Sequence, residues 1–361
     1  MDNSTGTLDP NRKRPGRAAR SNQVGRFERQ TREFVDDGWE REQDASVQRT
    51  NVSLEVPRSV ITRNSSPDIP FDRSLNPYRG CEHGCIYCFA RPTHAYLGLS
   101  PGLDFETELV ARPGAADVLR RDLSKRGYEP AVLAMGTNTD PYQPIEARYR
   151  IMPQILSVLL DFRHPLGIVT KGSLIERDIG LLSELAAEGL LHVGASVTSL
   201  DARLSRLMEP RVPAPARRLK VIERLAAAGI PVRVSVAPVI PSLTDHELEG
   251  IVQASADAGA KAANWIMLRL PREVSSLFQE WLSEHFADRA GRVMARVREM
   301  HGGQDYQAEW GRRMRGEGHY AQIIGHRFAI AAKRAGLDQD LPSLRTDLFR
   351  VPGRAEQLSL F

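Results

Sequence analysis

Cysteine is scarce in this 361-residue sequence, and its three cysteines, Cys81, Cys85 and Cys88, all lie within the stretch CEHGCIYC. An odd number of cysteines in one loop argues against a disulfide framework and indicates a reducing compartment. Long apolar runs are also missing, since no segment approaches the roughly 18–20 apolar residues of a membrane span. The first twenty residues contain no apolar core like that of a secretory leader. We therefore expect a soluble, cytoplasmic protein that has no membrane partner.

The charge of the chain is only slightly positive, with 49 Lys and Arg against 45 Asp and Glu. By itself this balance is weak evidence for a nucleic-acid partner. Residues 1–55 are polar and lack sustained hydrophobic periodicity, which predicts a disordered tail. The basic residues of this tail are Arg12, Lys13, Arg14, Arg17, Arg20, Arg26, Arg29 and Arg32. The tail is either solvated or an arm that contacts phosphates.

From about residue 70, short apolar runs alternate with amphipathic helical segments, a pattern typical of βα units and a parallel sheet. The expected strands are 73–79, 131–136, 167–171, 191–197, 231–239 and 264–270. Six units predict an α/β fold, a partial TIM-type (β/α)6 barrel with its chemistry at the carboxyl ends of the strands. We place this core at 56–275, a helical C-terminal extension at 276–345 and a flexible tail at 346–361.

Two hydroxyl residues occupy positions typical of helix capping boxes. Ser173 precedes Glu176 by three residues, and Thr244 precedes Glu247 by three. At this spacing each side chain can bond the backbone N–H of the other residue. We therefore predict that one helix begins at each of these positions.

The spacing of the three thiols allows them to surround one centre. One interpretation is a zinc site completed by His83, His94 or His164, although zinc sites usually contain a second cysteine pair or downstream histidines. An incidental cluster and a redox pair are further interpretations. An iron–sulfur cube normally takes four thiolates, so three would leave one iron without a protein ligand. Because an open position marks a catalytic metal site, a substrate or cofactor must then fill it.

The stretch CEHGCIYC resembles the C-x3-C-x-Φ-C signature of the radical S-adenosylmethionine (SAM) superfamily, with Tyr87 at the aromatic position Φ. The resemblance implies that Cys81, Cys85 and Cys88 hold a [4Fe-4S] cluster and that SAM binds the open iron. It also implies an enzyme that reductively cleaves SAM to a 5′-deoxyadenosyl radical, which then abstracts hydrogen from a substrate. Such an enzyme requires a low-potential electron donor. We therefore expect two cofactors, the [4Fe-4S] cluster and SAM.

The same resemblance predicts SAM contacts near the ends of successive strands. Tyr87 is expected against the adenine, Lys171 at the carboxylate, and Ser196 at the ribose or carboxylate of SAM. The segment GTNTDPYQPIE departs from the usual Gly-Gly-Glu form of the family. Its Asp140 is expected to pair with the SAM ammonium group, although Asp before Pro is also an ordinary turn residue. The predicted SAM-binding residues are Tyr87, Thr137, Asn138, Asp140, Lys171 and Ser196.

Four segments, NPYRGCEHGCIYC, GTNTDPYQPIE, VTK and EPRVPAP, together resemble the spore photoproduct lyase-related branch of the superfamily, which is DNA-repair photolyase-like. The resemblance implies lyase or related radical chemistry on a nucleic acid, most simply damaged DNA. In spore photoproduct lyase a separate cysteine returns the hydrogen atom, and this chain has no fourth cysteine; Tyr142 and Tyr320 are the alternative relays. Two other functions stay open: an RNA- or peptide-modifying radical SAM enzyme, and a non-enzymatic, clamp-associated Fe–S adaptor that binds DNA.

Two segments near the C-terminus are candidates for interaction. The stretch QLSLF resembles the peptide by which bacterial repair and replication proteins bind the DNA polymerase sliding clamp; its residues are Gln357, Leu358, Ser359, Leu360 and Phe361. The alternative is a tail that packs on its own domain. The second candidate is an arginine patch for phosphate contacts with aromatic residues for base stacking, formed by Arg312, Arg313, Arg315, Tyr306, Trp310 and Tyr320. These residues are equally consistent with charged helix positions and core aromatics.

Overall fold

The computed structural model describes residues 16–28 and 49–353. Its centre is a seven-stranded sheet in the order β10-β9-β8-β7-β6-β3-β2. The parallel strands are β3 (Arg73–Leu75), β6 (Leu133–Met135), β7 (Leu166–Thr170), β8 (Leu191–Ser196), β9 (Val232–Val239) and β10 (Ala262–Met267). At one edge, β2 (Ile61–Arg63) runs antiparallel to β3. The six predicted strands all overlap these six parallel strands, so the predicted α/β fold of the partial-barrel type is confirmed.

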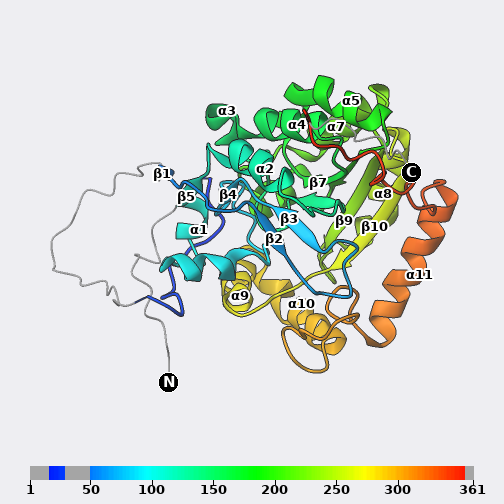
Figure 1. Cartoon of the computed structure of the whole chain (residues 1–361). Coiled ribbons are helices and arrows are strands. Elements are labelled where there is room, and N and C mark those ends of the chain that lie inside the picture. Colours follow the sequence, from blue (N-terminus) through cyan, green and yellow to red (C-terminus); the bar gives the residue numbers. More distant parts are fainter. Residues whose placement is uncertain (1–15, 29–48, 354–361) are drawn as a thin grey trace.

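Helices in the connections between the parallel strands cover the sheet (Figure 1). They are η1 (Arg91–Leu97), α1 (Asp104–Thr107), α2 (Ala115–Leu123), α3 (Glu146–Tyr149), α4 (Ile151–Asp161), η2 (Ser173–Asp178), α5 (Ile179–Ala187), α6 (Ala202–Met208), α7 (Pro215–Ala227), η3 (Asp245–Glu247) and α8 (Leu248–Asp257). The apolar faces of the longer helices are buried against the strands, as Leu159, Leu185 and Leu225 illustrate. Burial of these apolar faces is the main stabilising contribution to such a layer.

A small second sheet has the order β1-β5-β4 and is made of β1 (Asn51–Leu54), β5 (Glu108–Ala111) and β4 (Tyr78–Arg79). The cysteine loop follows β4 and precedes β5 in the chain. After β10 the chain is helical, with α9 (Glu273–His285), α10 (Ala287–Met300) and α11 (Gly318–Arg334). The predicted helical C-terminal region is therefore confirmed. Helices α9 and α10 form a second apolar cluster that includes Ile86 of the cysteine loop.

A helix begins at each of the two predicted positions, η2 at Ser173 and η3 directly after Thr244, but the side-chain bonds of the predicted capping boxes are wrong. Ser173 is the first residue of η2 rather than a cap, and the Glu176 carboxylate accepts hydrogen bonds from Arg217 and Arg224 instead. The Glu247 carboxylate accepts hydrogen bonds from the loop after β8, including one of 2.6 Å from the Leu200 N–H. In both cases the glutamate carboxylate accepts hydrogen bonds from residues distant in the sequence, and not from the backbone at the start of its own helix.

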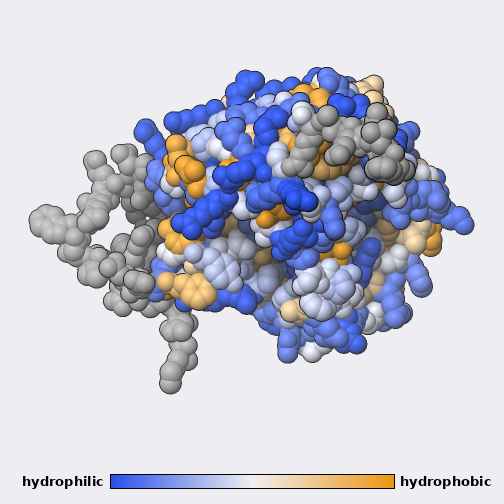
Figure 2. Space-filling view, viewed as in Figure 1, coloured by the Kyte–Doolittle hydropathy of each residue, from blue (hydrophilic) through white to orange (hydrophobic). Residues whose placement is uncertain are grey.

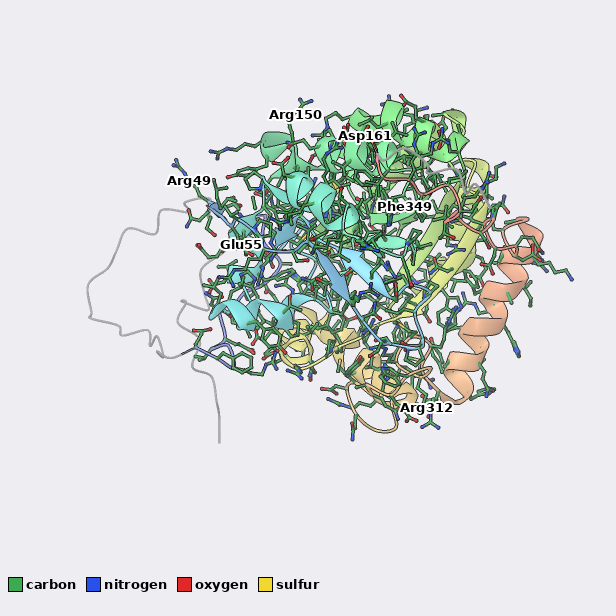
Figure 3. The ribbon with its side chains drawn as sticks, in the orientation of Figure 1. Arg49, Glu55, Arg150, Asp161, Arg312 and Phe349 are labelled. Atoms are coloured by element: carbon green, nitrogen blue, oxygen red, sulfur yellow. The ribbon has the colours of Figure 1, made fainter. Side chains whose placement is uncertain are left out.

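The prediction of disorder across residues 1–55 is wrong for the described part of that stretch. In residues 16–28 Ala19 is fully buried, and β1 pairs with β5 along its length. Polar composition concealed these contacts because they are made largely by backbone groups and arginines. The predicted flexible tail is likewise wrong for residues 346–353, where Phe349 packs on Tyr128, Phe162 and His164 (Figure 3). Residues 357–361, the QLSLF segment, lie outside the described residues.

The surface in Figure 2 is predominantly hydrophilic, with hydrophobic side chains in separate small areas. Exposed large apolar residues such as Val56 and Tyr96 are normal when they occur singly. Within the described ranges, none of the helices combines the length and apolarity that crossing a membrane requires.

Candidate active site

A cavity lies at the carboxyl ends of the parallel strands, where a parallel barrel is expected to carry its chemistry. Its walls contain all nine residues that the sequence singled out for the cluster and SAM: Cys81, Cys85, Cys88, Tyr87, Thr137, Asn138, Asp140, Lys171 and Ser196. These residues come from the cysteine loop, from the segments that follow β6 and β7, and from the end of β8. The fold therefore brings them together around one space.

Arg91 anchors the cysteine loop from within the protein. Its guanidinium is fully buried and donates hydrogen bonds to the carbonyl oxygens of Cys85 at 3.0 Å, Gly84 at 3.1 Å and Gly102 at 2.8 Å. It also forms a 2.5 Å ion pair with Glu106, which is fully buried too. Gly84 has φ +66°, and a Cβ there would lie 2.7 Å from the Glu106 carboxylate, so the turn requires glycine. The sequence analysis missed Arg91 and Glu106, which carry no motif signal.

Residues 16–28 supply further bonds to the same carboxylate. The backbone N–H groups of Ala18 and Ala19 donate to the Glu106 carboxylate at 3.2 and 3.0 Å, and Arg17 donates to the Glu106 carbonyl oxygen at 2.7 Å. Buried carboxylates need such donors because an unpaired buried charge is costly. The N-terminal segment thus belongs to the support of the cysteine loop.

Burial raises the pKa of all three thiols, and the nearby carboxylates Asp140 and Glu209 raise the pKa of Cys81 and Cys85 respectively still further. In the absence of a metal centre the thiols are therefore protonated at neutral pH. A cationic metal centre would reverse this balance, because thiolate ligands must lose their protons to bind.

No group of three His, Cys, Asp or Glu side chains within residues 16–28 and 49–353 is arranged to hold a single metal ion. His94 packs edge-on against Phe105, and His164 contacts the Tyr128 hydroxyl at 2.8 Å, so neither completes a zinc site with the thiols. In a [4Fe-4S] cube each thiolate binds a different iron atom. Three thiols in one loop that do not converge on one ion fit the cube and argue against zinc.

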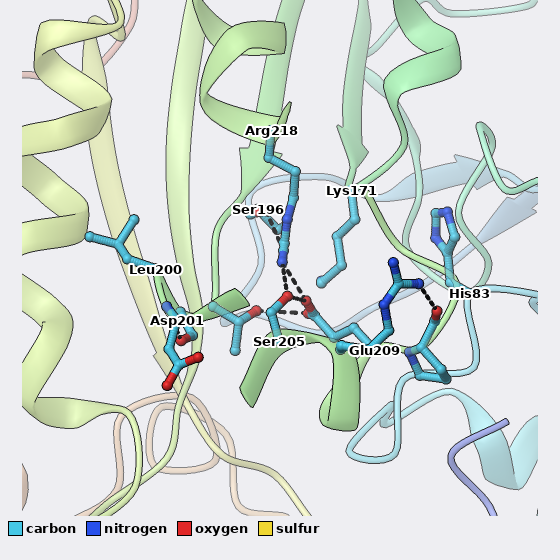
Figure 4. Close-up of polar contacts among 12 residues, drawn as sticks. His83, Lys171, Ser196, Leu200, Asp201, Ser205, Glu209 and Arg218 are labelled. Carbon is cyan, nitrogen blue, oxygen red and sulfur yellow. Dashed lines mark hydrogen bonds and ion pairs between the residues drawn. The ribbon is translucent and has the colours of Figure 1, made fainter. Parts of the chain in front are cut away.

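Tyr87 belongs to a buried polar network beside the cavity. Figure 4 shows Ser205, Glu209 and Arg218 of this network. Its hydroxyl donates to the carboxylate of Glu209, and Thr198 donates to the same carboxylate at 2.9 Å. Arg218 closes the network with a 2.6 Å ion pair to Glu209, in which both side chains are almost fully buried. The position of the Tyr87 ring is therefore fixed by its hydroxyl. Arg218 carries no motif signal, and the sequence analysis missed it.

The Lys171 ammonium group lies over the Tyr87 ring, 5.9 Å from the ring centroid. It forms no ion pair with any residue of the described ranges, although the carboxylate of Glu209 is near enough to be influenced by its charge. Burial raises the pKa of Glu209, but the charges of Arg218 and Lys171 and the hydrogen bonds to its carboxylate outweigh this effect and lower the pKa. The Lys171 ammonium group is therefore available to an anionic ligand in the cavity.

Asp140 is engaged by its own protein. Its carboxylate accepts hydrogen bonds from the Thr170 hydroxyl at 2.6 Å and from the backbone N–H groups of Lys171 at 2.7 Å and Tyr142 at 2.9 Å, while His83 Nδ1 lies 3.3 Å away. Burial raises the pKa of Asp140, but His83 and these hydrogen bonds lower it below its usual value. Asp140 thus ties the end of β7 to the loop after β6. A pairing with the SAM ammonium group would compete with these bonds.

The backbone after β6 approaches β7 unusually closely at Gly136. Its φ is +85°, and a Cβ at this position would lie 1.9 Å from the carbonyl oxygen of Val169. Only glycine allows this approach. Thr137 and Asn138 follow directly in the cavity wall, and Ser196, the last residue of β8, also lines the cavity. The close approach thus sets where Thr137 and Asn138 meet a ligand.

The sequence analysis also missed an aromatic–arginine pair in the cavity wall. Phe89, the residue after Cys88, is 44% exposed, and the Arg269 guanidinium lies 4.6 Å from its ring centroid. Arg269 also donates to the Tyr306 hydroxyl at 3.4 Å. Its Nε atom is buried without a hydrogen-bond partner in the described part of the protein.

The arginines of the predicted patch mostly form contacts within the protein. Arg313 forms a two-pronged ion pair with Asp68 at 2.7 and 2.5 Å. Arg312 pairs with two glutamates, and Arg315 lies over the ring of Trp265 at 4.5 Å. The alternative interpretation, charged positions that stabilise the fold, describes these arginines better. Neither of the proposed radical relays, Tyr142 and Tyr320, lines the cavity.

Fold and site together define an iron–sulfur enzyme built on a parallel partial barrel. Residues 75–254 match the Radical SAM superfamily. The chain is 40% identical over 235 residues to the uncharacterized protein Rv2578c of Mycobacterium tuberculosis, which covers 64% of this chain and 68% of that protein. It is 27% identical over 173 residues to the uncharacterized protein MJ0683 of Methanocaldococcus jannaschii, which covers 48% of this chain and 62% of that one. The chain belongs to the radical SAM superfamily, which confirms the predicted family and implies a [4Fe-4S] cluster and SAM.

Solved structures of spore photoproduct lyase have a similar fold. One, complexed with dinucleoside spore photoproduct, has a TM-score of 0.55 at 15% identity and covers 78% of this chain and 79% of its own. A variant of the same enzyme has a TM-score of 0.56 at 16% identity and covers 84% of this chain and 87% of its own. At such low identity the likeness establishes the common fold.

Proposed function

We propose that this radical SAM enzyme acts on a nucleic acid, with damaged or modified DNA as its substrate and DNA repair as its role. The observation that carries the proposal is the Phe89–Arg269 pair, which lies in the wall of the cysteine cavity. An exposed aromatic ring provides a surface on which a base can stack. A guanidinium beside it can contact a phosphate or a base edge. Solved structures of similar fold include one complexed with a dinucleoside photoproduct, which supports the same substrate class.

Cys81, Cys85 and Cys88 would hold the [4Fe-4S] cluster, with SAM at the iron that lacks a thiolate. Together these groups supply one-electron cleavage of SAM to a radical that abstracts hydrogen. Lys171 is placed to attract the SAM carboxylate, since its ammonium group lines the cavity and forms no ion pair with another residue of the described ranges. Ser196 offers a hydroxyl at the end of β8, and Tyr87 offers a ring fixed by Glu209.

The final hydrogen transfer is proposed to differ from that of spore photoproduct lyase. All three cysteines of the chain belong to the cluster motif, so no thiol is left to return a hydrogen atom. Tyr142 is fully buried away from the cavity wall, and the Tyr320 hydroxyl donates to Asp245. Thymine-dimer cleavage by a cysteine-dependent route is therefore not the reaction that we propose.

The QLSLF segment, residues 357–361, remains a proposed docking peptide for the DNA polymerase sliding clamp. Deletion of these five residues should lower the affinity of the full-length protein for the clamp in a surface-plasmon-resonance titration. An unchanged affinity would remove the clamp from the proposal without affecting the proposed chemistry.

The substrate class is tested anaerobically with the reconstituted full-length protein. We expect damaged or modified DNA to increase 5′-deoxyadenosine formation more than matched RNA or peptide does. The Phe89→Ala variant should bind single-stranded DNA roughly tenfold more weakly, since a base–aromatic stack contributes about 1–3 kcal/mol. Basal SAM cleavage should persist in this variant. Tyr96→Ala, which removes an aromatic side chain that is 66% exposed and outside the cavity, is the control.

If RNA or a peptide increased 5′-deoxyadenosine formation more than DNA does, that molecule would replace DNA as the proposed substrate class. Equal losses of DNA affinity in the Phe89 and Tyr96 variants would show that the cavity aromatic has no special part in binding.

A further inference from the structure

A second cavity lies beside the cysteine loop and shares no lining residue with the first. The loop separates the two cavities, because His83 lines the first and the preceding residue, Glu82, lines the second. Glu82 is bonded directly to the cluster residue Cys81. The second cavity is therefore one residue away from a cluster thiol, on a side that the proposed SAM and substrate contacts do not use.

The lining of the second cavity is strongly basic. It contains four arginines, from four separate segments of the chain, and a single acidic residue, Glu82. The arginines are Arg17, Arg49, Arg148 and Arg211. Arginines gathered from distant segments around one concave surface create a positive potential that favours an acidic partner.

The floor of this cavity is held by internal bonds. Thr50 donates a hydrogen bond of 2.7 Å to Glu82, and Arg211 forms a 2.8 Å ion pair with the same carboxylate. Arg17 donates to the Thr50 hydroxyl at 2.8 Å. The Glu82 N–H in turn donates to Gln143 at 2.7 Å. These bonds order the surface next to Cys81 before any partner binds.

The rim offers charge to solvent. Arg49 and Arg148 are exposed, and neither forms an ion pair with another residue in the described ranges. Figure 3 shows Arg49 projecting outward from the edge of the molecule near β1. The Arg148 guanidinium lies over the ring of Tyr149, 5.3 Å from its centroid, which fixes its direction without neutralising it. Both charges are available to a partner.

From these features we infer that the second cavity is the docking surface for an acidic, low-potential protein that donates one electron to the cluster. The inference rests on the proposed reductive cleavage of SAM, which consumes one electron per event. The donor is oxidised by one electron, the cluster is reduced by one, and no atom is transferred. Because electron transfer slows steeply with distance, a donor must bind close to a cluster ligand. The arginine-lined surface beside Cys81 meets this requirement, and it leaves the first cavity open to substrate.

The test uses the full-length reconstituted protein and an acidic bacterial flavodoxin as the donor probe. The variant Arg49→Glu/Arg148→Glu reverses both rim charges. The control Lys333→Glu/Arg334→Glu makes the same change of net charge at the end of α11, on the far side of the sheet from β1 (Figure 1). Binding of flavodoxin is measured by titration at two salt concentrations. 5′-Deoxyadenosine formation is then measured with flavodoxin hydroquinone and, separately, with dithionite.

We expect the rim variant to bind flavodoxin about tenfold or more weakly, with less dependence on salt. Its flavodoxin-driven turnover should fall in parallel, while dithionite-driven turnover stays at the wild-type rate. The α11 control should behave like the wild type. Wild-type affinity in the rim variant, or an equal loss in both variants, would overturn the inference.

A loss of DNA affinity without a loss of flavodoxin affinity would instead assign the second cavity to nucleic acid and also overturn the inference. Failure of the proposed function looks different, because it appears with dithionite as an absence of DNA-stimulated SAM cleavage, whatever the behaviour of flavodoxin.

Discussion

Replacement of Arg91 by methionine removes the positive charge beneath the cysteine loop while keeping most of the length of the side chain. The wild-type guanidinium bonds four backbone carbonyls around the loop and pairs with Glu106, and both side chains are fully buried. The substitution would leave those carbonyls without their donor and the carboxylate without its cation. We expect both the stability of the apoprotein and its capacity to hold a cluster to fall.

The magnitude follows from the burial of the pair. Removal of one partner from a buried ion pair typically costs about 3–5 kcal/mol, because the other charge remains buried without compensation. For a folded chain of this size, that loss corresponds to a Tm lowered by roughly 5 °C. An exposed pair contributes about 0–1 kcal/mol. Arg120→Met is the matched control, since Arg120 forms an ion pair of the same 2.5 Å length with Asp161 at a solvent-exposed position.

Thermal unfolding of the apoproteins measures the stability, and iron and sulfide content after anaerobic reconstitution measures the cluster. The double variant Arg91→Met/Glu106→Gln removes the ion pair without leaving a buried carboxylate that lacks its cation. We expect it to be more stable than the summed effects of Arg91→Met and Glu106→Gln, each measured alone, predict. An Arg91→Met protein that melts with the Arg120→Met control and retains a full cluster would refute the assignment of Arg91 as the anchor of the loop.

Three further predictions concern the first cavity. Lys171→Met should weaken SAM binding to the reconstituted enzyme by about tenfold or more, as measured by equilibrium dialysis, because the cavity loses a cation that forms no ion pair in the described ranges. Lys171→Arg should bind more tightly than Lys171→Met, and equal SAM affinity in all three proteins would contradict the proposed contact. Glu209 has a folded-state pKa below its ordinary 4.5, so its ionised form stabilises the fold above pH 4.5, and this contribution is lost as the pH falls further. Acid titration of the apoproteins should therefore show a steeper loss of stability below pH 4.5 in the wild type than in Glu209→Gln, and parallel curves would argue against an ionised Glu209. Gly136→Ala should lower the free energy of unfolding by about 1–3 kcal/mol or more, because its φ of +85° and the nearby Val169 carbonyl oxygen both exclude a side chain. A wild-type Tm in that variant would mean that the segment after β6 can move away from β7 at little cost.

Much of the fold could be predicted from the sequence because the strands are largely apolar, with one face buried and the other mostly half-buried, and therefore read as short apolar runs. The run LHVGASV, for instance, contains β8, whose first residue, Leu191, is fully buried. The capping boxes failed because a local pattern competes with partners elsewhere. Arg217 and Arg224 lie on α7, far from Glu176 in the sequence, and only the folded chain brings them within reach.

The residues of the candidate site also fall into two groups, those that a sequence pattern predicts and those that only the folded chain brings together. Cys81, Tyr87 and Lys171 could be found because the spacing of the cysteine motif and the position of a residue directly after a predicted strand can both be read from the sequence. The residues that hold them in position could not be found. Glu106 meets Arg91 across a turn and meets Ala19 from a segment 87 positions earlier, and neither contact leaves a periodic signal. The polar composition of residues 16–28 led to a wrong prediction of disorder. Their contacts with Glu106 are made by backbone N–H groups, which are present whatever the side chain.

The contact between residues 16–28 and Glu106 has a practical consequence for how the protein should be produced. The superfamily match begins at residue 75, and an expression vector designed on that boundary would omit the donors at Ala18 and Ala19. The truncated polypeptide would retain every cysteine, but it would lose β2 and nearly all of β3 from the large sheet, and Glu106 would lose two of its hydrogen bonds. Poor iron incorporation in such a fragment would then reflect the choice of start codon rather than the chemistry of the enzyme.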